Sequence, residues 1–384
     1  MPLRSESRPL VIAALGCSQT IGWASSYYLP AVLAAPMAAT FDRSPVFVFA
    51  AFSAAMVISA TISPWAGARI DARGGRGILV ASNLVFASAL LILATAPAYW
   101  VLALGWVVMG LGMGLGLYEA AFATLAGIYG GKARGPITGI TLIAGFASTV
   151  GWPLSGLMLA QWGWREACLG WALIHLCLAL PLNLLLPRGT SATPSSDDPP
   201  QDGPAPPRIA LWLLAFVFAA TWFNSTAMAA HLPGLLQAAG ASTATAIAAG
   251  ALIGPAQVAA RVLEFSLLRR FHPLASARLA AAAHPVAAVC LVTFGGPASF
   301  AFALIHGAGN GILTIAKGTL PLALFGSAGY GARLGWLNAP ARVLQAAAPL
   351  IFGAALAAWG VHAIWLTAII GVLSTAALFM LRRT

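Results

Sequence analysis

Five charged side chains lie inside long apolar stretches of this sequence, where charges are rare. One is an isolated carboxylate, Glu119, and two are cations, Lys317 and Arg342; all three lie toward the middle of their stretch. The other two, Arg261 and Glu264, lie near the end of one stretch, three positions apart. If these stretches cross a membrane, each charge in the hydrocarbon costs at least about 2.5–3.5 kcal/mol. We expect charges at that depth to bind a substrate or a proton, with a structural ion pair as the alternative.

Glu119 is predicted to be a protonation site. Burial disfavours the charged form of an isolated carboxylate, whereas a neighbouring cation favours it. A carboxylate balanced between these two effects can take up and release a proton as the cavity around it changes. We expect Lys317 or Arg342 to face Glu119 or the substrate across that cavity. Because the deep cations outnumber the single deep acid, the favoured substrate is a small organic anion that moves with protons.

Polar side chains in four apolar stretches suit the wall of a substrate cavity. The candidates are Gln19 and Tyr27 in the first stretch, Asn224 in the seventh, His306 and Asn310 in the tenth, and Asn338 in the eleventh. His175, His284 and His306 are each alone in their stretch, so a structural role is expected for each. His306 is the best candidate for a proton relay because it lies one turn before Asn310.

The spacings that other kinds of chemistry require are not found in the sequence. The four cysteines all lie in apolar stretches, and no His, Cys or acidic cluster has metal-ligand spacing. The glycine run 110–116 lacks the strand before it and the lysine-serine after it that a phosphate-binding loop needs. We therefore expect no metal, no cofactor and no ATP-driven transport within this chain, and interpret the glycine run as a helix-packing seam.

The composition indicates a membrane protein. The chain is 60% hydrophobic and 8% charged, whereas a soluble domain has roughly 25% charged residues. The net charge of +11 does not indicate nucleic-acid binding, because the basic residues are scattered over short loops instead of forming one patch. The bilayer is thus the expected solvent, and we expect a monomeric multi-pass protein of the cell (inner) membrane.

The apolar stretches predict twelve membrane helices, since about 20 apolar residues cross a bilayer. The stretches are 9–33, 45–66, 77–97, 100–128, 136–160 and 166–187 in the first half, and 209–238, 244–266, 274–294, 297–325, 333–358 and 361–381 in the second. Between the halves, residues 188–208 hold six prolines and no apolar run, which predicts a disordered cytoplasmic linker. The expected organisation is a six-helix half at 1–187, the linker at 188–208 and a second six-helix half at 209–384.

Two further patterns support this organisation. Glycines 112, 114 and 116 align with glycines 307, 309 and 311 of the second half, and Pro153 aligns with Pro349. A repeat of half the chain length indicates two similar halves. With the N-terminus inside, most of the 20 basic residues fall in inner segments and only Arg43 and Arg165 in outer loops. Both termini are therefore predicted to be cytoplasmic.

The segment between the second and third stretches carries a family resemblance. It reads Gly67-Ala-Arg-Ile-Asp71-Ala-Arg73-Gly74-Gly-Arg76, and it resembles the signature of the major facilitator superfamily. Ala72 and Gly75 stand where the family usually has basic residues. A degraded copy at 260–269 has Glu264 in the place of the aspartate.

The resemblance implies a twelve-helix transporter whose two halves rock by alternating access. It also implies that the signature residues latch the inner helix ends between conformations. The residues to which it gives this gating role are Gly67, Asp71, Arg73, Arg76, Arg261 and Glu264. The structural alternatives are a carboxylate near a helix end and, for Arg261 and Glu264, a simple pair on one helix face.

Two other functions remain open. The stretch at Gly145 and Gly151-Trp-Pro153-Leu-Ser-Gly156 resembles the glycine-proline motif of superfamily exporters, with a tryptophan inserted before the proline. This motif favours proton-driven efflux of a drug or toxic metalloid, and a helix kink is its structural alternative. A membrane-embedded enzyme or receptor is more remote, because clustered catalytic residues and a sizeable extramembrane domain are not visible. The prediction is therefore a secondary transporter and not an enzyme.

Overall fold

The computed structural model describes residues 7–188, 208–267 and 270–381. Almost all of the predicted linker, together with Arg269, lies outside this range. Within the described residues every regular element is a helix, and nine segments are long and apolar enough to cross a membrane. Two of these segments, Tyr99–Trp162 and Tyr330–Met380, contain 64 and 51 residues, more than twice what one crossing needs. The all-helical membrane fold is confirmed, and the count of twelve helices stays a prediction.

The chain forms two compact units. The first consists of Met1–Gln201 and Phe325–Ala339, and the second of Asp202–Leu324 and Pro340–Thr384. Residues 325–339 come from the second half of the sequence but group with the first unit. One long helix, α16 (Tyr330–Trp359), therefore begins in the first unit and continues in the second.

Besides the start of α16, the first unit contains ten α-helices and two short helices of other types. They are α1 (Arg8–Ser25), α2 (Pro30–Ala39), α3 (Pro45–Arg73), α4 (Arg76–Thr95), α5 (Tyr99–Gly116), α6 (Tyr118–Tyr129), the 3-10 helix η1 (Gly130–Ala133), α7 (Arg134–Ala144), α8 (Ala147–Trp162), α9 (Trp164–Ile174), the π-helix η2 (His175–Ala179) and α10 (Leu180–Leu185). Two of them, α2 and α3, begin at a proline, which suits a first helical position because its missing N–H has no helical partner there.

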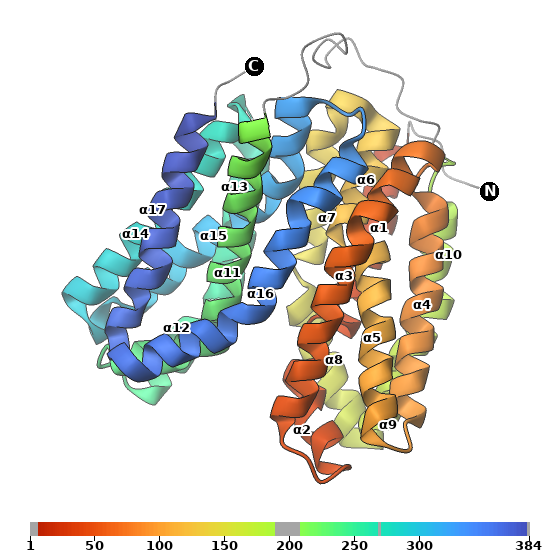
Figure 1. Cartoon of the computed structure of the whole chain (residues 1–384), viewed down its shortest axis with the longest axis horizontal. Coiled ribbons are helices and arrows are strands. Elements are labelled where there is room, and N and C mark those ends of the chain that lie inside the picture. The colour runs from red at the N-terminus through yellow and green to blue at the C-terminus, as the bar shows by residue number, and fades with distance from the viewer. Residues whose placement is uncertain (1–6, 189–207, 268–269, 382–384) are drawn as a thin grey trace. The chain divides into compact units, whose positions relative to one another are not determined.

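Close backbone contacts hold the middle of this unit together. Figure 1 shows α5 between α3 and α4, and both neighbours pack against it. A methyl group on Gly110 would lie 2.8 Å from the Ala55 Cα atom of α3, and one on Gly112 would lie 2.8 Å from the Phe86 ring of α4. The glycine run of α5 thus lets two helices approach closely, which is the packing role expected of it.

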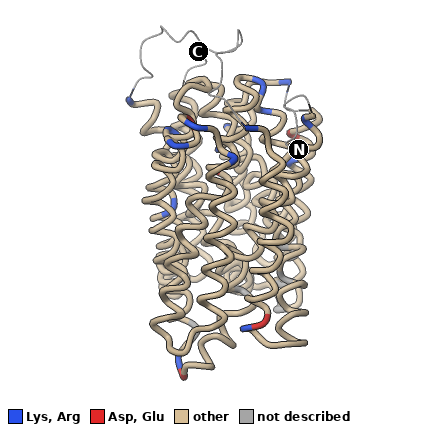
Figure 2. Tube along the Cα trace, turned by 90° about the vertical axis from the view of Figure 1, so that its right-hand side faces the viewer, with Lys and Arg blue, Asp and Glu red and all other residues tan. Residues whose placement is uncertain are grey.

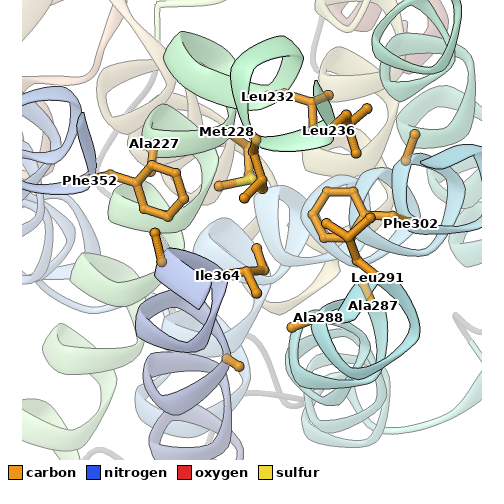
Figure 3. Close-up of a cluster of buried hydrophobic side chains, with 14 of the residues drawn as sticks. Ala227, Met228, Leu232, Leu236, Ala287, Ala288, Leu291, Phe302, Phe352 and Ile364 are labelled. Carbon is orange, nitrogen blue, oxygen red and sulfur yellow. The ribbon is translucent and has the colours of Figure 1, made fainter. Parts of the chain in front are cut away.

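The second unit is built from the remaining helices around an apolar core. Besides the rest of α16, they are α11 (Arg208–Ala238), α12 (Thr243–Ala251), α13 (Ile253–Ser266), α14 (Pro273–Phe294), the 3-10 helix η4 (Gly296–Ala298), α15 (Ser299–Phe325), the 3-10 helix η5 (Gly360–Ala363) and α17 (Ile364–Met380). Figure 3 shows part of the core, where Met228 of α11, Leu291 of α14, Phe302 of α15, Phe352 of α16 and Ile364 of α17 lie together.

The structure corrects the predicted helix ends at the signature segment. This segment was expected to be a loop, but α3 continues through Asp71 to Arg73, and only Gly74 and Gly75 separate it from α4. Residues 67–73 contain no helix breaker after Gly67, so the helix continues until the glycine pair. Gly74 takes a positive φ of 79°, which glycine adopts without steric cost. The signature therefore presents its side chains from a helix.

The charged side chains occupy the expected parts of the helices. Figure 2 shows Lys and Arg mostly near helix ends, with few along the helix middles. In the first unit, Arg8 begins α1, Arg73 ends α3 and Arg76 begins α4. This placement agrees with a bilayer around the helix middles, because charges are costly in hydrocarbon.

Candidate functional site

Glu119 lies beside a break in the fourth apolar stretch. The sequence predicts one continuous helix there, but α5 ends at Gly116 and α6 begins at Tyr118, with Leu117 extended at φ −83° and ψ −165°. Gln19 of α1 donates a hydrogen bond from Nε2 to the Gly116 carbonyl oxygen at 2.6 Å. Glu119 is therefore a buried residue in the first turn of a half-helix. Because the N-terminus of a helix favours negative charge, this position suits a carboxylate side chain.

Aromatic rings from α1, α3 and α6 and from the turn that follows α1 gather next to this break. The Trp23 ring of α1 lies 4.9 Å from the Tyr118 ring of α6, measured between ring centroids. The Tyr27 ring lies 5.3 Å from Trp23 and 5.8 Å from Phe52 of α3. Tyr27, predicted as a cavity residue, thus belongs to an aromatic cluster. Tyr118 was missed by the sequence analysis, although its position directly before Glu119 is a signal that could have indicated it.

The two deep cations of the second unit share one partner. The Lys317 Nζ atom of α15 lies 3.5 Å from the centroid of the Trp222 ring, and the Arg342 Cζ atom of α16 lies 4.8 Å from it. Lys317 is 5% exposed and Arg342 is 1% exposed. Cation–π contacts stabilise each cation, but two buried like charges at one ring also repel each other. An anion bound beside them relieves that repulsion.

The polar surroundings of these cations include several amides. Arg342 donates from Nη1 to Gln345 Oε1 at 3.2 Å. On α11, two residues after Trp222, Asn224 donates to the Thr367 carbonyl oxygen at 3.2 Å. Asn310 of α15 donates to Ser225 Oγ at 3.0 Å. The amide oxygens of Asn224 and Asn310 are buried without a hydrogen-bond partner. These groups give the second unit hydrogen-bond acceptors as well as cations.

The remaining candidate amide lies in the first unit. Asn338 of α16 donates from Nδ2 to the Leu334 carbonyl oxygen of its own helix at 2.9 Å. Its Oδ1 atom is also buried without a hydrogen-bond partner. Asn338 therefore lies in the part of α16 that groups with the first unit.

The structure pairs two histidines that looked isolated in the sequence. His306 of α15 lies with its Nδ1 atom 3.1 Å from His284 Nδ1 of α14, and both rings are buried. His284 and His306, each alone in its own apolar stretch, thus meet across two helices, because α14 and α15 pack side by side at these positions. His175 bonds to Ser25 Oγ at 2.7 Å and to Asn83 Oδ1 at 2.9 Å, a satisfied structural arrangement. Within the described ranges, three or more His, Cys, Asp or Glu residues do not gather where they could hold a metal.

Asp71 of the signature segment caps the first turn of α16. Its Oδ1 atom accepts from the Gly331 N–H at 2.8 Å, and its Oδ2 atom accepts from the Ala332 N–H at 2.9 Å. A carboxylate at a helix N-terminus satisfies free N–H groups and matches the positive end of the helix dipole. We call this contact, made by Asp71, Gly331 and Ala332 within the first unit, the Asp71 latch.

Glycines let α3 and α16 approach closely enough to form the latch. A methyl group on Gly67 would overlap the Gly331 carbonyl, and one on Gly335 would lie 2.6 Å from the Ser63 carbonyl oxygen. Gly75, which replaces a basic residue of the family signature, lies against Thr124 of α6, where an added methyl group would be 2.6 Å from the Thr124 Cβ atom. The departure at Gly75 therefore has a packing reason.

The other residues predicted to act in gating are not part of the latch. Arg73 is exposed at the end of α3, and Arg76 is half-buried at the start of α4. Arg261 and Glu264 lie buried on α13 of the second unit, where Arg261 Nη2 donates to Gln257 Oε1 at 3.4 Å. The structure thus brings Gly67 and Asp71 together at α16 within the first unit.

Gly67→Ala is expected to abolish most transport. Its methyl group would collide with the Gly331 backbone, so α3 and α16 must separate and the Asp71 latch must lengthen. Gly77→Ala is the matched control, because a methyl group on Gly77 of α4 would meet nothing within 4 Å. Transport is measured in liposomes at equal protein content. Normal transport by the Gly67→Ala variant would show that the close approach of α3 and α16 is dispensable.

The sequence of this chain is similar to those of known membrane transport proteins. The family model described as Major Facilitator Superfamily matches residues 14–305 of this chain. Two Multidrug resistance protein B homologs of Mycobacterium tuberculosis, from strains H37Rv and CDC 1551, are each 33% identical over 128 residues. That match covers 33% of this chain and 24% of each relative.

Solved structures resemble the chain over nearly its whole length. The human organic anion transporter MFSD10 has 16% sequence identity and a TM-score of 0.74, over 98% of this chain and 100% of that one. The proton:xylose symporter XylE has 13% identity and a TM-score of 0.76, over 98% and 96%. The E. coli fucose:proton symporter FucP has 16% identity and a TM-score of 0.71, over 99% and 100%. At these identities the similarity shows a shared fold.

Proposed function

Because the chain belongs to the Major Facilitator Superfamily, we propose that this membrane transporter moves a small organic anion together with protons. Transport by members of this superfamily is secondary, so the energy comes from a gradient and not from a nucleotide. The proposal also places the protein in the cell (inner) membrane with both termini in the cytoplasm. It takes 1–187 and 209–384 as the two halves that rock around a central site, joined by the 188–208 linker.

The observation that carries the proposal is the shared contact of Lys317 and Arg342 with Trp222. Both cations are buried, and both lie against one indole ring. Two buried cations at one ring repel each other, so this site favours a ligand that brings negative charge. A carboxylate can accept a charge-assisted hydrogen bond from each cation, and the indole offers an apolar surface to the rest of a small molecule.

Glu119 is the proposed proton-binding group. It is 8% exposed and lies in the first turn of α6, directly after the break between α5 and α6. XylE and FucP are named as proton symporters and MFSD10 as an organic anion transporter; those activities are theirs, and they support the same pairing of roles here. That Glu119 serves the same cavity as the two cations stays a prediction.

Efflux of a drug or toxic metalloid is the second candidate. The relatives named Multidrug resistance protein B homolog favour it, as does the glycine-proline segment of the fifth stretch. There, α7 ends at Ala144 and α8 begins at Ala147, and a methyl group on Gly151 would lie 2.7 Å from the Ala24 Cβ atom of α1. The segment thus combines an interrupted helix with close helix packing, and both the export and the packing interpretations predict this.

Uptake by the full chain in liposomes tests the two candidates against each other. We expect small carboxylates to accumulate when the outside is acidic, and accumulation to collapse when an ionophore removes the pH difference. Sugars and lipophilic cations are included in the same assay. Proton-driven movement of lipophilic cations without movement of carboxylates would overturn the anion proposal and favour efflux.

A further inference from the structure

Three helices of the first unit meet at the first turn of α16. Asp71 of α3 accepts the Gly331 and Ala332 N–H groups, as described above. The backbones of α3 and α16 touch at Gly67 and Gly331. The third helix is α6, because a Cβ atom on Gly331 would lie 3.0 Å from the Ala123 Cβ atom. The Asp71 latch is therefore built directly against the helix that carries Glu119.

Tyr330 lies between the latch and Glu119. It is the first residue of α16, immediately before Gly331, and its side chain is 0% exposed. On α6, Glu119 precedes Ala123 by four residues, so it lies one turn along the same helix face. The charges of Glu119 and Asp71 both act on the Tyr330 hydroxyl group. One buried phenol is thus adjacent in sequence to the latch and within electrostatic range of both carboxylates.

Three arginines lie on the helices that meet near Tyr330: Arg333, Arg73 and Arg76. Arg333 is the cation whose charge also acts on Tyr330, and its guanidinium donates to the carbonyl oxygens of Phe325 and Ala328, which fixes it to the preceding turn. On the other helices packed here, Arg73 is exposed at the end of α3 and Arg76 begins α4. Asp71 and Glu119 are thus the two carboxylates near Tyr330, and Glu119 is the one carried by α6.

We propose that Tyr330 is a positioning residue that couples the charge of Glu119 to the Asp71 latch. The proposal rests on the proposed role of Glu119 as the proton-binding group. An ionised Glu119 holds the phenol and, with it, the first turn of α16 against α3 and α6. A protonated Glu119 attracts the phenol less, since a charged acceptor makes a stronger hydrogen bond than a neutral one. Proton binding then loosens the α16 turn and makes the latch easier to open.

Hydrogen exchange of the full chain in detergent tests the coupling at one pH, through the peptide that covers residues 326–337. The Gly331 and Ala332 amides in this peptide are protected by Asp71. Tyr330→Phe, which keeps the ring and removes the hydroxyl, is expected to raise their exchange rate about tenfold, the effect of one hydrogen bond to a charged group. Glu119→Gln is expected to have the same effect, and the double variant no more than either alone. Asp71→Asn, which weakens the acceptor itself, gives the scale for an open latch.

Tyr129→Phe is the matched control. Tyr129 ends the same helix α6, and its hydroxyl is buried without a hydrogen-bond partner, so its removal is expected to leave the exchange of the 326–337 peptide unchanged. Wild-type protection in either Tyr330→Phe or Glu119→Gln overturns the proposal. So does a double variant in which the two effects add in full. The Glu119→Gln arm leaves Tyr330 untouched and therefore tests the coupling even if Tyr330→Phe accumulates poorly.

Proton-driven uptake by the same variants separates this proposal from the proposed function. Loss of uptake in Glu119→Gln with unchanged exchange shows that Glu119 couples transport without acting on the latch, and overturns the role of Tyr330. Faster exchange with normal uptake retains the link through Tyr330 and removes Glu119 from proton coupling.

Discussion

Glu119→Gln is expected to abolish proton-driven accumulation of substrate while leaving exchange of substrate across the membrane measurable. Glutamine has nearly the size of a protonated glutamate but cannot release a proton. If one proton moves with each substrate, a difference of one pH unit supplies about 1.36 kcal/mol, which drives about tenfold accumulation in the wild type. The variant is expected to show no accumulation, because its transport cycle is no longer tied to proton movement.

Two assays in one liposome preparation check this result. Uptake against a concentration difference measures coupling, and counterflow between loaded and external substrate measures binding and movement alone. Glu166→Gln is the matched control, because Glu166 is a carboxylate in the first turn of a different helix, α9. A well-expressed Glu119→Gln protein that still concentrates substrate would show that this carboxylate is not the coupling site.

Removing either cation at Trp222 is expected to weaken anion binding strongly. A hydrogen bond to a charged group contributes about 1.5–3 kcal/mol, so Lys317→Ala and Arg342→Ala should each raise the Kd about 10- to 100-fold. The loss should be larger for a dicarboxylate than for a monocarboxylate, since only the former can use both cations fully. Binding is measured on purified protein by titration calorimetry, with substrate chosen from the uptake assay.

The structural interpretation of these cations makes a different prediction. If Lys317 and Arg342 only hold helices together, each alanine variant should lose membrane abundance and thermal stability together with activity. Lys132→Ala is the matched control, because Lys132 is an exposed cation of η1 and its removal should change neither binding nor stability. Unchanged Kd values in stable Lys317 and Arg342 variants would contradict an anion site at Trp222.

The fold class, the family and the depth of the buried charges follow from the sequence by itself. Apolar stretches of about 20 residues and a charged fraction of 8% are sufficient to predict an all-helical membrane protein. The signature residues Gly67 and Asp71 predicted the superfamily, which the family model confirms. The depth of Glu119, Lys317 and Arg342 also follows from the sequence, because the position of a charge within an apolar stretch is a local property.

Only the tertiary structure decided which of these residues meet. Lys317 and Arg342 share Trp222, which lies 95 and 120 positions before them in the chain, and hydrophobic periodicity carries no information on such pairs. The sequence likewise placed His284 and His306 in separate stretches, whereas packing of α14 on α15 brings their rings together. A membrane helix presents several faces to its neighbours. Which helix packs against a given face determines the partner that a side chain on that face contacts.

The same reason explains the latch and the helix break. Asp71 caps amides 260 and 261 positions further along the chain, and Gln19 reaches the Gly116 carbonyl 97 positions away. A glycine-rich stretch permits a break but does not require one, so the sequence predicted a continuous helix through Leu117. The break exists where a side chain from α1 supplies the hydrogen bond that the helix gives up, and that contact forms only when the helices pack.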